Sequence, residues 1–340
     1  MTARTSAIAA FLQETQWSDA TKTPLAGDAS ARRYIRLQRP SGQKAILMDA
    51  PKENSEDIRP FLRIAQFLTA YGFSAPEIWQ ASEDAGLIVM EDLGDDLFVK
   101  VMADGTADQL SLYQAAVDVL LELQALAPPA DLAVMDHKTL AEMTEPAFTW
   151  YCDTPAKGID EAFASFVGAL QHLLETYLPE PSVLVLRDFH AENLLWLPDR
   201  DGSARVGLLD FQDALIGHPA YDLVSMLQDA RRDVPEDIEH ATKAYFQHKA
   251  HSDPESFDAG FHLLGLQRNL RILGIFARLC KQAGKPHYVD FIPRVHAHVI
   301  RNLAHPALQD IAKALRSVLP EPTPKFLQSL KDQCATHPKP

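Results

Sequence analysis

The chain has 340 residues, and 46% of them are hydrophobic, enough for one large core or two moderate ones. Its formal net charge of −14 disfavours nonspecific binding to nucleic acid through phosphate neutralisation. No apolar run reaches the roughly 18 residues of a membrane span, and the first residues lack the apolar core of a signal peptide. The three cysteines form no C-x-x-C pair, as is usual in reduced proteins. We therefore expect a cytoplasmic protein with no nucleic-acid, membrane or obligate protein partner.

The N-terminal part predicts a helix followed by strands. Apolar spacing predicts an amphipathic helix over residues 5–17. A turn of small residues then precedes a strand that ends at Leu37, and residues 43–48 predict the next strand. Because Gly27, Ser30 and their small neighbours permit close backbone approach, this turn is suited to cover nucleotide phosphates, and Ser30 is a candidate nucleotide contact. An ordinary hairpin turn is the alternative.

A helix and a strand complete this region. Apolar residues recur with helical spacing over residues 56–70, where Pro60 restricts the first turn. Residues 87–90 form a short apolar run, typical of a buried strand, that leads into Glu91 and Leu93. In kinases the corresponding strand ends in the hinge whose backbone pairs with adenine, so both residues are nucleotide-binding candidates. A strand followed by an acidic turn is the alternative.

The remainder of the chain is mainly helical by its apolar periodicity. The predicted helices are 110–124, 161–178, 221–230 and most of 235–317, with breaks near Asp253-Pro254 and at 284–286. From Pro320 the sequence predicts a poorly ordered end or a final short helix.

The residues that carry chemistry follow two short apolar runs, 183–186 and 206–209, which predict buried strands joined by a polar hairpin. Asp188 and Asn193 follow the first run, and Asp210 follows the second. A hairpin would bring the two strand ends together. We therefore expect a carboxylate-rich pocket at the edge of a sheet.

The spacing of these three residues is that of the catalytic loop and metal site of kinases. Asp188 can accept the proton of an alcohol that attacks ATP. Asn193 and Asp210 supply oxygen ligands of the kind that hold Mg²⁺. Ordinary loop acids are the alternative, but a second strand that ends in Asp210-Phe211 at the right distance favours a kinase.

One kinase residue is missing. Met48 stands where the strand lysine of kinases is expected. Lys44 shares that strand face but lies about 13 Å back along the strand. Arg32 or Arg33 on the neighbouring strand is therefore the better candidate for a phosphate contact.

The order and the sequences of these motifs resemble those of the aminoglycoside phosphotransferase/choline kinase-like superfamily. By this resemblance Asp188 is the catalytic base, and Asn193 and Asp210 are the magnesium ligands. The superfamily usually has a histidine two positions before the base, where this chain has Leu186. This difference weakens the likeness to the antibiotic-modifying members.

Nearly the whole chain resembles a narrower family, the anomeric N-acetylmuramate/N-acetylglucosamine kinases of cell-wall recycling. The resemblance is carried by the segments GDASARRYIRL, AILMDAP, VMEDLGDDLF, VLRDFHAENLLWL, GLLDFQDALIGHPAYDLVSMLQDARRDV and QRNLRILGIFARL. That family also has LMDAP in place of the lysine strand. The resemblance implies transfer of the ATP γ-phosphoryl group, with Mg²⁺, to the anomeric hydroxyl of an amino sugar.

Together, the elements and the resemblance predict an α+β, bilobal protein-kinase-like fold. A small antiparallel-sheet N-lobe is expected beside a larger, mainly helical C-lobe. We expect residues 1–92 to form the nucleotide-binding lobe, and residues 93–340 to form the catalytic and sugar-binding lobe.

Candidate sugar-binding residues are those expected near the base, namely His190, Asp213 and Arg231. Trp150 and Tyr151 are of a type that stacks on a pyranose face. Each has a structural alternative: a histidine that orients the loop, an arginine at a solvated helix end, or aromatic rings packed in the core.

Two other functions stay open at this level. One is a kinase for another small alcohol, such as an aminoglycoside, choline, homoserine or methylthioribose. The other is a pseudokinase or binding module that uses the fold without catalysis. The absent histidine and lysine favour the pseudokinase, whereas the intact Asp188, Asn193 and Asp210 argue against it.

Overall fold

The computed structural model describes residues 3–25, 32–52, 57–152 and 159–337. Contacts divide the chain into two compact units. The first comprises Met1–Val119 with Ala191–Ala214, and the second comprises Leu120–His190 with Leu215–Pro340. The predicted assignment of nucleotide binding to residues 1–92, and of catalysis and sugar binding to residues 93–340, is not tested by this division and stays a prediction.

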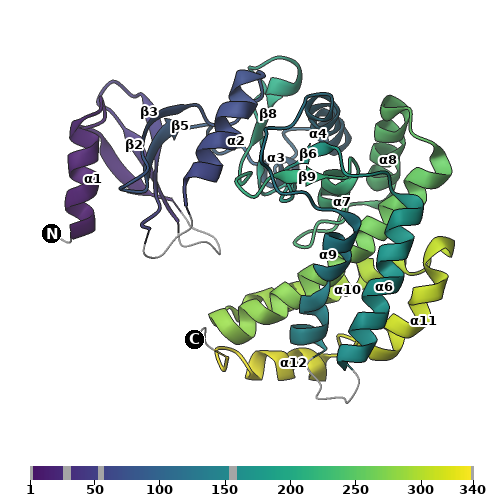
Figure 1. The fold of residues 1–340 in the computed structure, drawn as a ribbon. Helices are drawn as coiled ribbons and strands as arrows, with labels where there is room; N and C mark the ends of the chain where they lie inside the picture. The colour runs from purple at the N-terminus through teal and green to yellow at the C-terminus, as the bar shows by residue number, and fades with distance from the viewer. Residues whose placement is uncertain (1–2, 26–31, 53–56, 153–158, 338–340) are drawn as a thin grey trace. The chain divides into compact units, whose positions relative to one another are not determined.

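The first unit is built on a five-stranded antiparallel sheet (Figure 1). In spatial order the strands are β1 (Thr21–Pro24), β2 (Arg33–Gln38), β3 (Lys44–Asp49), β5 (Leu87–Glu91) and β4 (Ile78–Ser82). The strands predicted up to Leu37, at 43–48 and at 87–90 are confirmed as β2, β3 and β5.

One face of this sheet is the hydrophobic core of the first unit. Side chains alternate along each strand, so Leu37, Leu47 and Val89 point to the same side. They cluster with Phe11 and Leu12 of α1 (Ala3–Gln13), the helix predicted at 5–17, which ends earlier than expected.

Helix α2 (Arg59–Ala70) lies on the other side of the sheet from α1 (Figure 1). Pro60 occupies its first turn, where a missing N–H removes no helical hydrogen bond. The predicted helix at 56–70 is confirmed with a slightly later start. Phe61 of α2 stacks on Phe211 with ring centroids 4.9 Å apart, which anchors the segment that ends at Ala214.

Segment Ala191–Ala214 adds a hairpin to the first unit. Its strands are β7 (Leu194–Trp196) and β8 (Val206–Leu208), and the short helix η2 (Gly202–Arg205) lies in the connection. The predicted pairing of 183–186 with 206–209 is therefore wrong. β6 (Val183–Val185) pairs instead with β9 (Leu215–Gly217) in the second unit. The reason is that the connection contains a further apolar run, β7, and strands adjacent in sequence pair preferentially.

The second unit is mainly helical and is organised around α9 (Pro254–Ala283), a helix of 30 residues. Its other helices are the end of α4 (Gln109–Gln124), α5 (His137–Glu142), η1 (Ala147–Tyr151), α6 (Ile159–Tyr177), α7 (Tyr221–Leu227), α8 (Glu236–Ala250), η3 (Pro286–Phe291), α10 (Ile292–Asn302), η4 (Pro306–Leu308), α11 (Gln309–Val318) and α12 (Pro324–Asp332). Helix α3 (Phe98–Ala103) belongs to the first unit. Helices α6, α7, α10 and α12 all contact α9.

The predicted breaks on either side of α9 are confirmed by its caps. Asp253 accepts a hydrogen bond from the Ser256 N–H at 2.9 Å and so caps the N-terminus. Gly284 follows the last turn with a φ of 66°, a left-handed conformation that favours glycine. Of the two alternatives after Pro320, the final short helix is the one observed, as α12.

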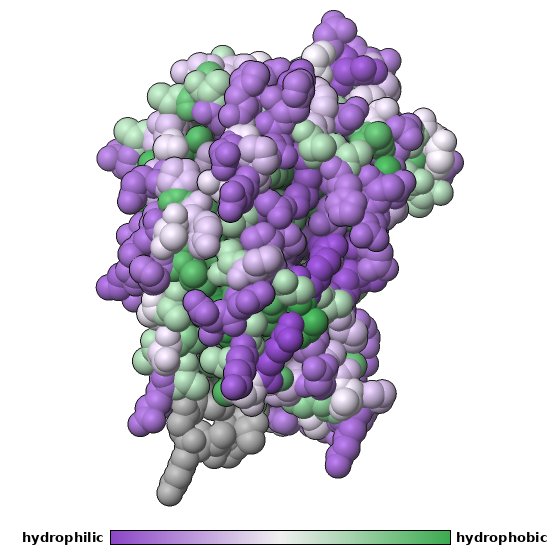
Figure 2. All heavy atoms as spheres, turned by 90° about the vertical axis from the view of Figure 1, so that its right-hand side faces the viewer, coloured by the Kyte–Doolittle hydropathy of each residue, from purple (hydrophilic) through white to green (hydrophobic). Residues whose placement is uncertain are grey.

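The face seen in Figure 2 is mainly hydrophilic, with hydrophobic residues in small scattered groups. Such a surface agrees with the strongly negative net charge of the chain. Among the described residues, no helix has both the length and the apolar character needed to cross a membrane.

Candidate active site

The candidate base, Asp188, follows β6 in a tightly constrained loop. Arg187 has a φ of 72°, and the Asp188 N–H donates back to the Leu186 carbonyl at 2.9 Å. Asp222, at the start of α7, accepts hydrogen bonds from the backbone N–H groups of Leu186 at 2.7 Å and Arg187 at 2.8 Å. A strained backbone persists only where its surroundings hold it in place. The Asp222 carboxylate therefore orients the loop that presents Asp188.

Asp222 is 1% exposed, and burial raises the pKa of its carboxyl to about 7. The two backbone N–H donors and the Arg268 guanidinium oppose this rise because they stabilise the ionised form. Sequence reasoning missed this residue. The available signal was an acid inside the apolar helix Tyr221–Leu227, where an unpaired charge would be costly.

Side chains from the next turn of α7 and from α9 also hold this loop in place. Ser225 donates to the Arg187 carbonyl at 3.0 Å and accepts from Arg268 Nη2 at 2.7 Å. Arg271, three residues further along α9, interacts electrostatically with Asp188, and burial lowers its pKa. The sequence had marked the QRNLRILGIFARL segment only as a family likeness. The structure places two of its three arginines, Arg268 and Arg271, beside the loop that carries Asp188.

His190 and Arg231, both predicted to bind the sugar, lie together in the second unit. Arg231 Nη1 is 3.2 Å from His190 Nε2. His190 is 4% exposed, and burial, followed by Arg231 and Arg268, lowers its pKa well below the usual value. The ring is therefore neutral at pH 7, and since a guanidinium only donates, Nε2 is the acceptor. His190 is suited to orient Arg231 and the loop, not to donate a proton.

Trp150 and Tyr151 lie in another part of this unit. Lys281 of α9 donates to the Trp150 carbonyl at 3.0 Å, and Lys281 is ten residues, or about 15 Å of helix, beyond Arg271. Tyr151 is fully buried, and its hydroxyl donates to the Pro320 carbonyl at 2.7 Å. The structure does not bring either ring beside Asp188, and Tyr151 is a core residue.

The two candidate metal ligands lie side by side in the first unit, at the open end of the β7–β8 hairpin. Asn193 precedes β7 and Asp210 follows β8, and the Leu209 N–H donates to the Asn193 carbonyl at 3.0 Å. Asn193 Nδ2 is 3.5 Å from Asp210 Oδ2, and Gln212 Nε2 donates to Asp210 Oδ1 at 2.8 Å. Asp210 is exposed, with a φ of 57°, so its carboxylate is held outside the core while Phe211 is buried.

A magnesium ion fits this pair of side chains. Mg²⁺ prefers oxygen ligands and usually takes one or two carboxylates together with substrate phosphates. In the part of the chain that the structure describes, no group of three or more His, Cys, Asp or Glu residues could hold a metal ion. The donor set therefore suits an ion that arrives with a nucleotide. Asp213 is exposed and belongs to the same unit as Asp210.

The two candidate phosphate-binding arginines, Arg32 and Arg33, point to opposite sides of the sheet. Arg33 pairs with the buried Asp49, its Nη2 lying 2.6 Å from Asp49 Oδ2, on the α1 side. Arg32 alternates to the other side and hydrogen-bonds to Tyr34, which lies opposite Met48 in the strand register. Burial raises the Tyr34 pKa, and the charge of Asp210 adds to this rise. Arg32, and not Arg33, is thus on the side of the metal ligand.

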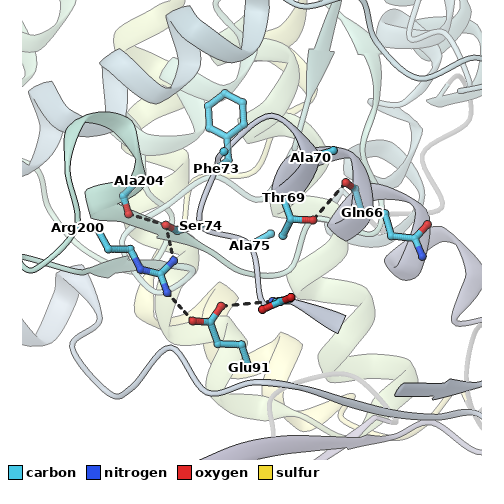
Figure 3. A pocket seen from close by; sticks show the side chains of 11 residues that line it. Gln66, Thr69, Ala70, Phe73, Ser74, Ala75, Glu91, Arg200 and Ala204 are labelled. Atoms are coloured by element: carbon cyan, nitrogen blue, oxygen red, sulfur yellow. Dashed lines mark hydrogen bonds and ion pairs between the residues drawn. The ribbon is translucent and has the colours of Figure 1, made fainter. Parts of the chain in front are cut away.

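The remaining nucleotide candidates are only partly described. Ser30 and Gly27 lie outside the described residues. The Glu91 carboxylate accepts from Arg200 Nη2 at 2.5 Å (Figure 3). Its backbone N–H donates to the Glu77 carbonyl at 2.9 Å, so neither group is open to adenine. The backbone of Leu93 makes no hydrogen bond to other backbone groups among the described residues. Of the two hinge candidates, Leu93 has the backbone suited to pair with adenine.

The segment around Leu93 is held to the sheet by charge pairing. Arg36 of β2 donates to Asp92 Oδ1 at 3.0 Å and to Asp95 Oδ1 at 2.8 Å. The Arg36 guanidinium lowers the pKa of the Asp95 carboxyl. This tether fixes the chain on both sides of Leu93.

Comparison with known proteins identifies the family of the chain. Residues 21–259 match the phosphotransferase enzyme family. In solved structures the fold is similar to an ethanolamine kinase of Plasmodium vivax, with a TM-score of 0.59 and 11% identity over 87% of this chain and 85% of that one. It is also similar to a macrolide 2′-phosphotransferase of Brachybacterium faecium, with a TM-score of 0.56 and 16% identity over 89% and 97% of the two chains.

The fold and the site thus define an ATP-dependent kinase, and the predicted α+β protein-kinase-like fold is confirmed. The chain belongs to the phosphotransferase enzyme family. Among curated proteins it is 38% identical to the N-acetylmuramate/N-acetylglucosamine kinase of Caulobacter vibrioides, over 91% of this chain and 94% of that protein. It is 32% identical to the protein of the same name from Pseudomonas aeruginosa, over 87% of this chain and 88% of that one.

Proposed function

We propose that this kinase transfers the γ-phosphoryl group of ATP to the anomeric hydroxyl of N-acetylmuramate, N-acetylglucosamine or both, in the cytoplasm, as a step of peptidoglycan recycling. The observation that carries the proposal is similarity over nearly the full length of kinases with that name, not over the family domain alone. The local order around Asp188 supports catalysis rather than a pseudokinase, because backbone strain is maintained there by Asp222.

In this mechanism Asp188 accepts the proton of the sugar hydroxyl as its oxygen attacks the γ-phosphorus. Asp222, Ser225 and Arg268 keep the loop in place, so the carboxylate needs no reorganisation when the sugar binds. Asn193 and Asp210 would hold Mg²⁺, which neutralises phosphate charge when bound. Arg32 would take the role of the missing lysine on the phosphates.

The sugar would meet a basic surface of the second unit. N-acetylmuramate carries a carboxylate that N-acetylglucosamine lacks. In the second unit, Arg231 contacts His190 and Arg271 interacts electrostatically with Asp188. A guanidinium pairs with a carboxylate through two parallel hydrogen bonds. We therefore assign these arginines to N-acetylmuramate recognition. Asp213 stays a candidate for a sugar hydroxyl.

The first test is ATP consumption with each sugar, followed by phosphorus NMR of the product. We expect phosphate on the anomeric carbon and a loss of turnover of roughly 100- to 10,000-fold in Asp188→Asn, the usual effect of removing a general base. Asp199→Asn, an exposed acid in the hairpin connection, is the matched control and should keep full turnover.

The outcomes separate the alternatives. Turnover with another small alcohol but with neither sugar would discard the substrate assignment and keep the kinase. Near wild-type turnover in Asp188→Asn would refute the base assignment. In the same assay Arg231→Ala should lower kcat/KM for N-acetylmuramate about tenfold more than for N-acetylglucosamine, the value of one charge-assisted hydrogen bond. An equal loss for both sugars would exclude carboxylate recognition.

A further inference from the structure

The β7–β8 hairpin holds the two candidate magnesium ligands at one end and Arg200 at the other. Arg200 lies in the connection between the strands, where its N–H donates to the Leu197 carbonyl at 3.1 Å. A hairpin transmits displacement along its length because its cross-strand hydrogen bonds keep the two strands in register. What fixes the connection end therefore also influences the position of Asn193 and Asp210.

The Arg200 side chain makes two directed contacts outside the hairpin (Figure 3). Nη2 lies 2.5 Å from Glu91 Oε1 at the end of β5, and Nη1 donates to Ser74 Oγ at 2.7 Å. Ser74 in turn donates to the carbonyl of Ala204, back in the hairpin, at 2.5 Å. The guanidinium thus joins three separate segments of the first unit, and its two contacts use different nitrogen atoms.

These side chains line a shallow pocket of about 500 Å³ between the end of α2, β5 and the hairpin. The Arg200 side chain is 35% exposed and that of Glu91 is 26% exposed, so water screens their attraction. Pairs of this kind contribute little to stability. Their geometric effect is independent of that, because a forked donor fixes direction as well as distance.

Backbone hydrogen bonds attach both paired strands of the hairpin to other segments of the first unit. On one edge, the Leu208 N–H donates to the Ser74 carbonyl at 2.9 Å. On the other edge, the Trp196 N–H donates to the Asp96 carbonyl at 2.8 Å. Both lie within the paired strands. Arg200 adds the link to β5, two residues before the adenine candidate Leu93.

We propose that Arg200 is a positioning residue that couples the adenine-binding hinge to the magnesium ligands through Glu91. The proposal rests on the roles proposed above for Leu93, Asn193 and Asp210. In this arrangement the strand that leads to the adenine-binding hinge and the hairpin that carries the metal ligands keep a fixed position relative to each other. Without the guanidinium, the connection keeps the Ser74–Ala204 hydrogen bond but loses its link to β5, so the distance between the metal ligands and the nucleotide phosphates is less firmly fixed.

The test compares binding of a fluorescent ADP analogue with and without Mg²⁺ in the full-length protein. In Arg200→Ala we expect the Mg²⁺ concentration for half-maximal ADP binding to rise about tenfold, within the range of measured coupling effects. Binding without Mg²⁺ should change little. Glu91→Gln should act in the same direction, and the double variant should be no worse than Arg200→Ala, because both remove one link.

Two further variants separate positioning from simple weakening of the hairpin. Arg200→Lys keeps the positive charge but lacks the two fixed N–H donor groups of the guanidinium, and it should recover only part of the magnesium response. Arg205→Ala removes another arginine of the same hairpin, one that packs over the Trp196 ring at 4.7 Å, and should leave the magnesium response unchanged. Equal effects of Arg200→Ala and Arg205→Ala, or equal losses with and without Mg²⁺, would overturn the proposal. Because the readout needs no sugar, it stands even if the sugar assignment fails.

Discussion

At the residue scale, the arrangement around Asp188 depends on Asp222, a buried carboxylate to which we assign no step of the reaction. Asp222 receives two consecutive backbone N–H groups, an arrangement that holds Arg187 in its left-handed conformation. Hydrogen bonds to a charged acceptor are stronger than neutral ones, and their loss leaves buried donors unsatisfied. The base and its support thus come from segments separated along the chain.

Asp222→Ala should therefore lower both stability and turnover. Loss of two hydrogen bonds to a buried carboxylate predicts a decrease of about 3 kcal/mol in the free energy of unfolding. Turnover should fall about 100-fold because Asp188 loses its fixed orientation. Urea denaturation and steady-state kinetics measure the two effects. Asp222→Asn, which keeps one acceptor oxygen, should lie between, and wild-type turnover in the alanine variant would show that the loop needs no such support.

At the element scale, close packing of η1 on α9 sets the shape of the second unit's core. Gly274 lies in α9 where a Cβ atom would overlap the backbone carbonyl of Pro146, just before η1. Backbone atoms cannot move aside as a flexible side chain can. Glycine is therefore required at this position because it has no Cβ atom, and not because of its backbone dihedral angles.

Gly274→Ala is accordingly expected to destabilise the protein by about 3 kcal/mol or more, as overpacking against a rigid group does. Thermal or urea unfolding measures this directly. Gly168→Ala in α6 is the matched control, since a Cβ there meets nothing within 4 Å. That helical site should gain about 0.5–1 kcal/mol from the replacement. A stable Gly274→Ala variant would mean that η1 can shift away from α9.

At the scale of the whole molecule, partly buried histidines make stability depend on pH. Burial lowers the pKa values of His218, His262 and His298 from 6.5 to about 4. Between these values the unfolded chain binds more protons than the folded one, so stability must fall as pH decreases from about 6.5 to 4. Asp222, whose pKa is raised to about 7, and Asp229, whose pKa burial also raises, act in the opposite sense, because the folded state keeps their protons to higher pH. Burial also lowers the pKa values of His190 and His296, so the histidines outnumber the carboxyls.

We therefore expect the urea midpoint to decrease between about pH 7 and pH 5. His262→Asn should reduce this slope, because it removes one of the groups that the unfolded state protonates. A midpoint that stays constant or rises on acidification would contradict the assignment of these histidines as neutral in the folded protein.

Local patterns in the sequence predicted the elements well. Apolar periodicity predicted α2, α4 and α9, and the predicted breaks near Asp253-Pro254 and at 284–286 match the ends of α9. These features depend on neighbours within a few residues, which the sequence displays directly. The pairing of β6 with β9 was missed, because strand partners are chosen by contacts far apart in the chain.

The sequence by itself pointed to the candidate chemical groups of this protein, namely Asp188 as base and Asn193 and Asp210 as oxygen ligands, and to the kinase family. Spacing suffices for these because each follows a strand within a few residues. Only the tertiary structure revealed the contacts from which we infer their support, namely those of Asp222 with the loop of the candidate base and those of Arg200 with Glu91. These residues act through hydrogen bonds to segments 35 and 109 positions away, and no local pattern records which distant group a side chain will meet.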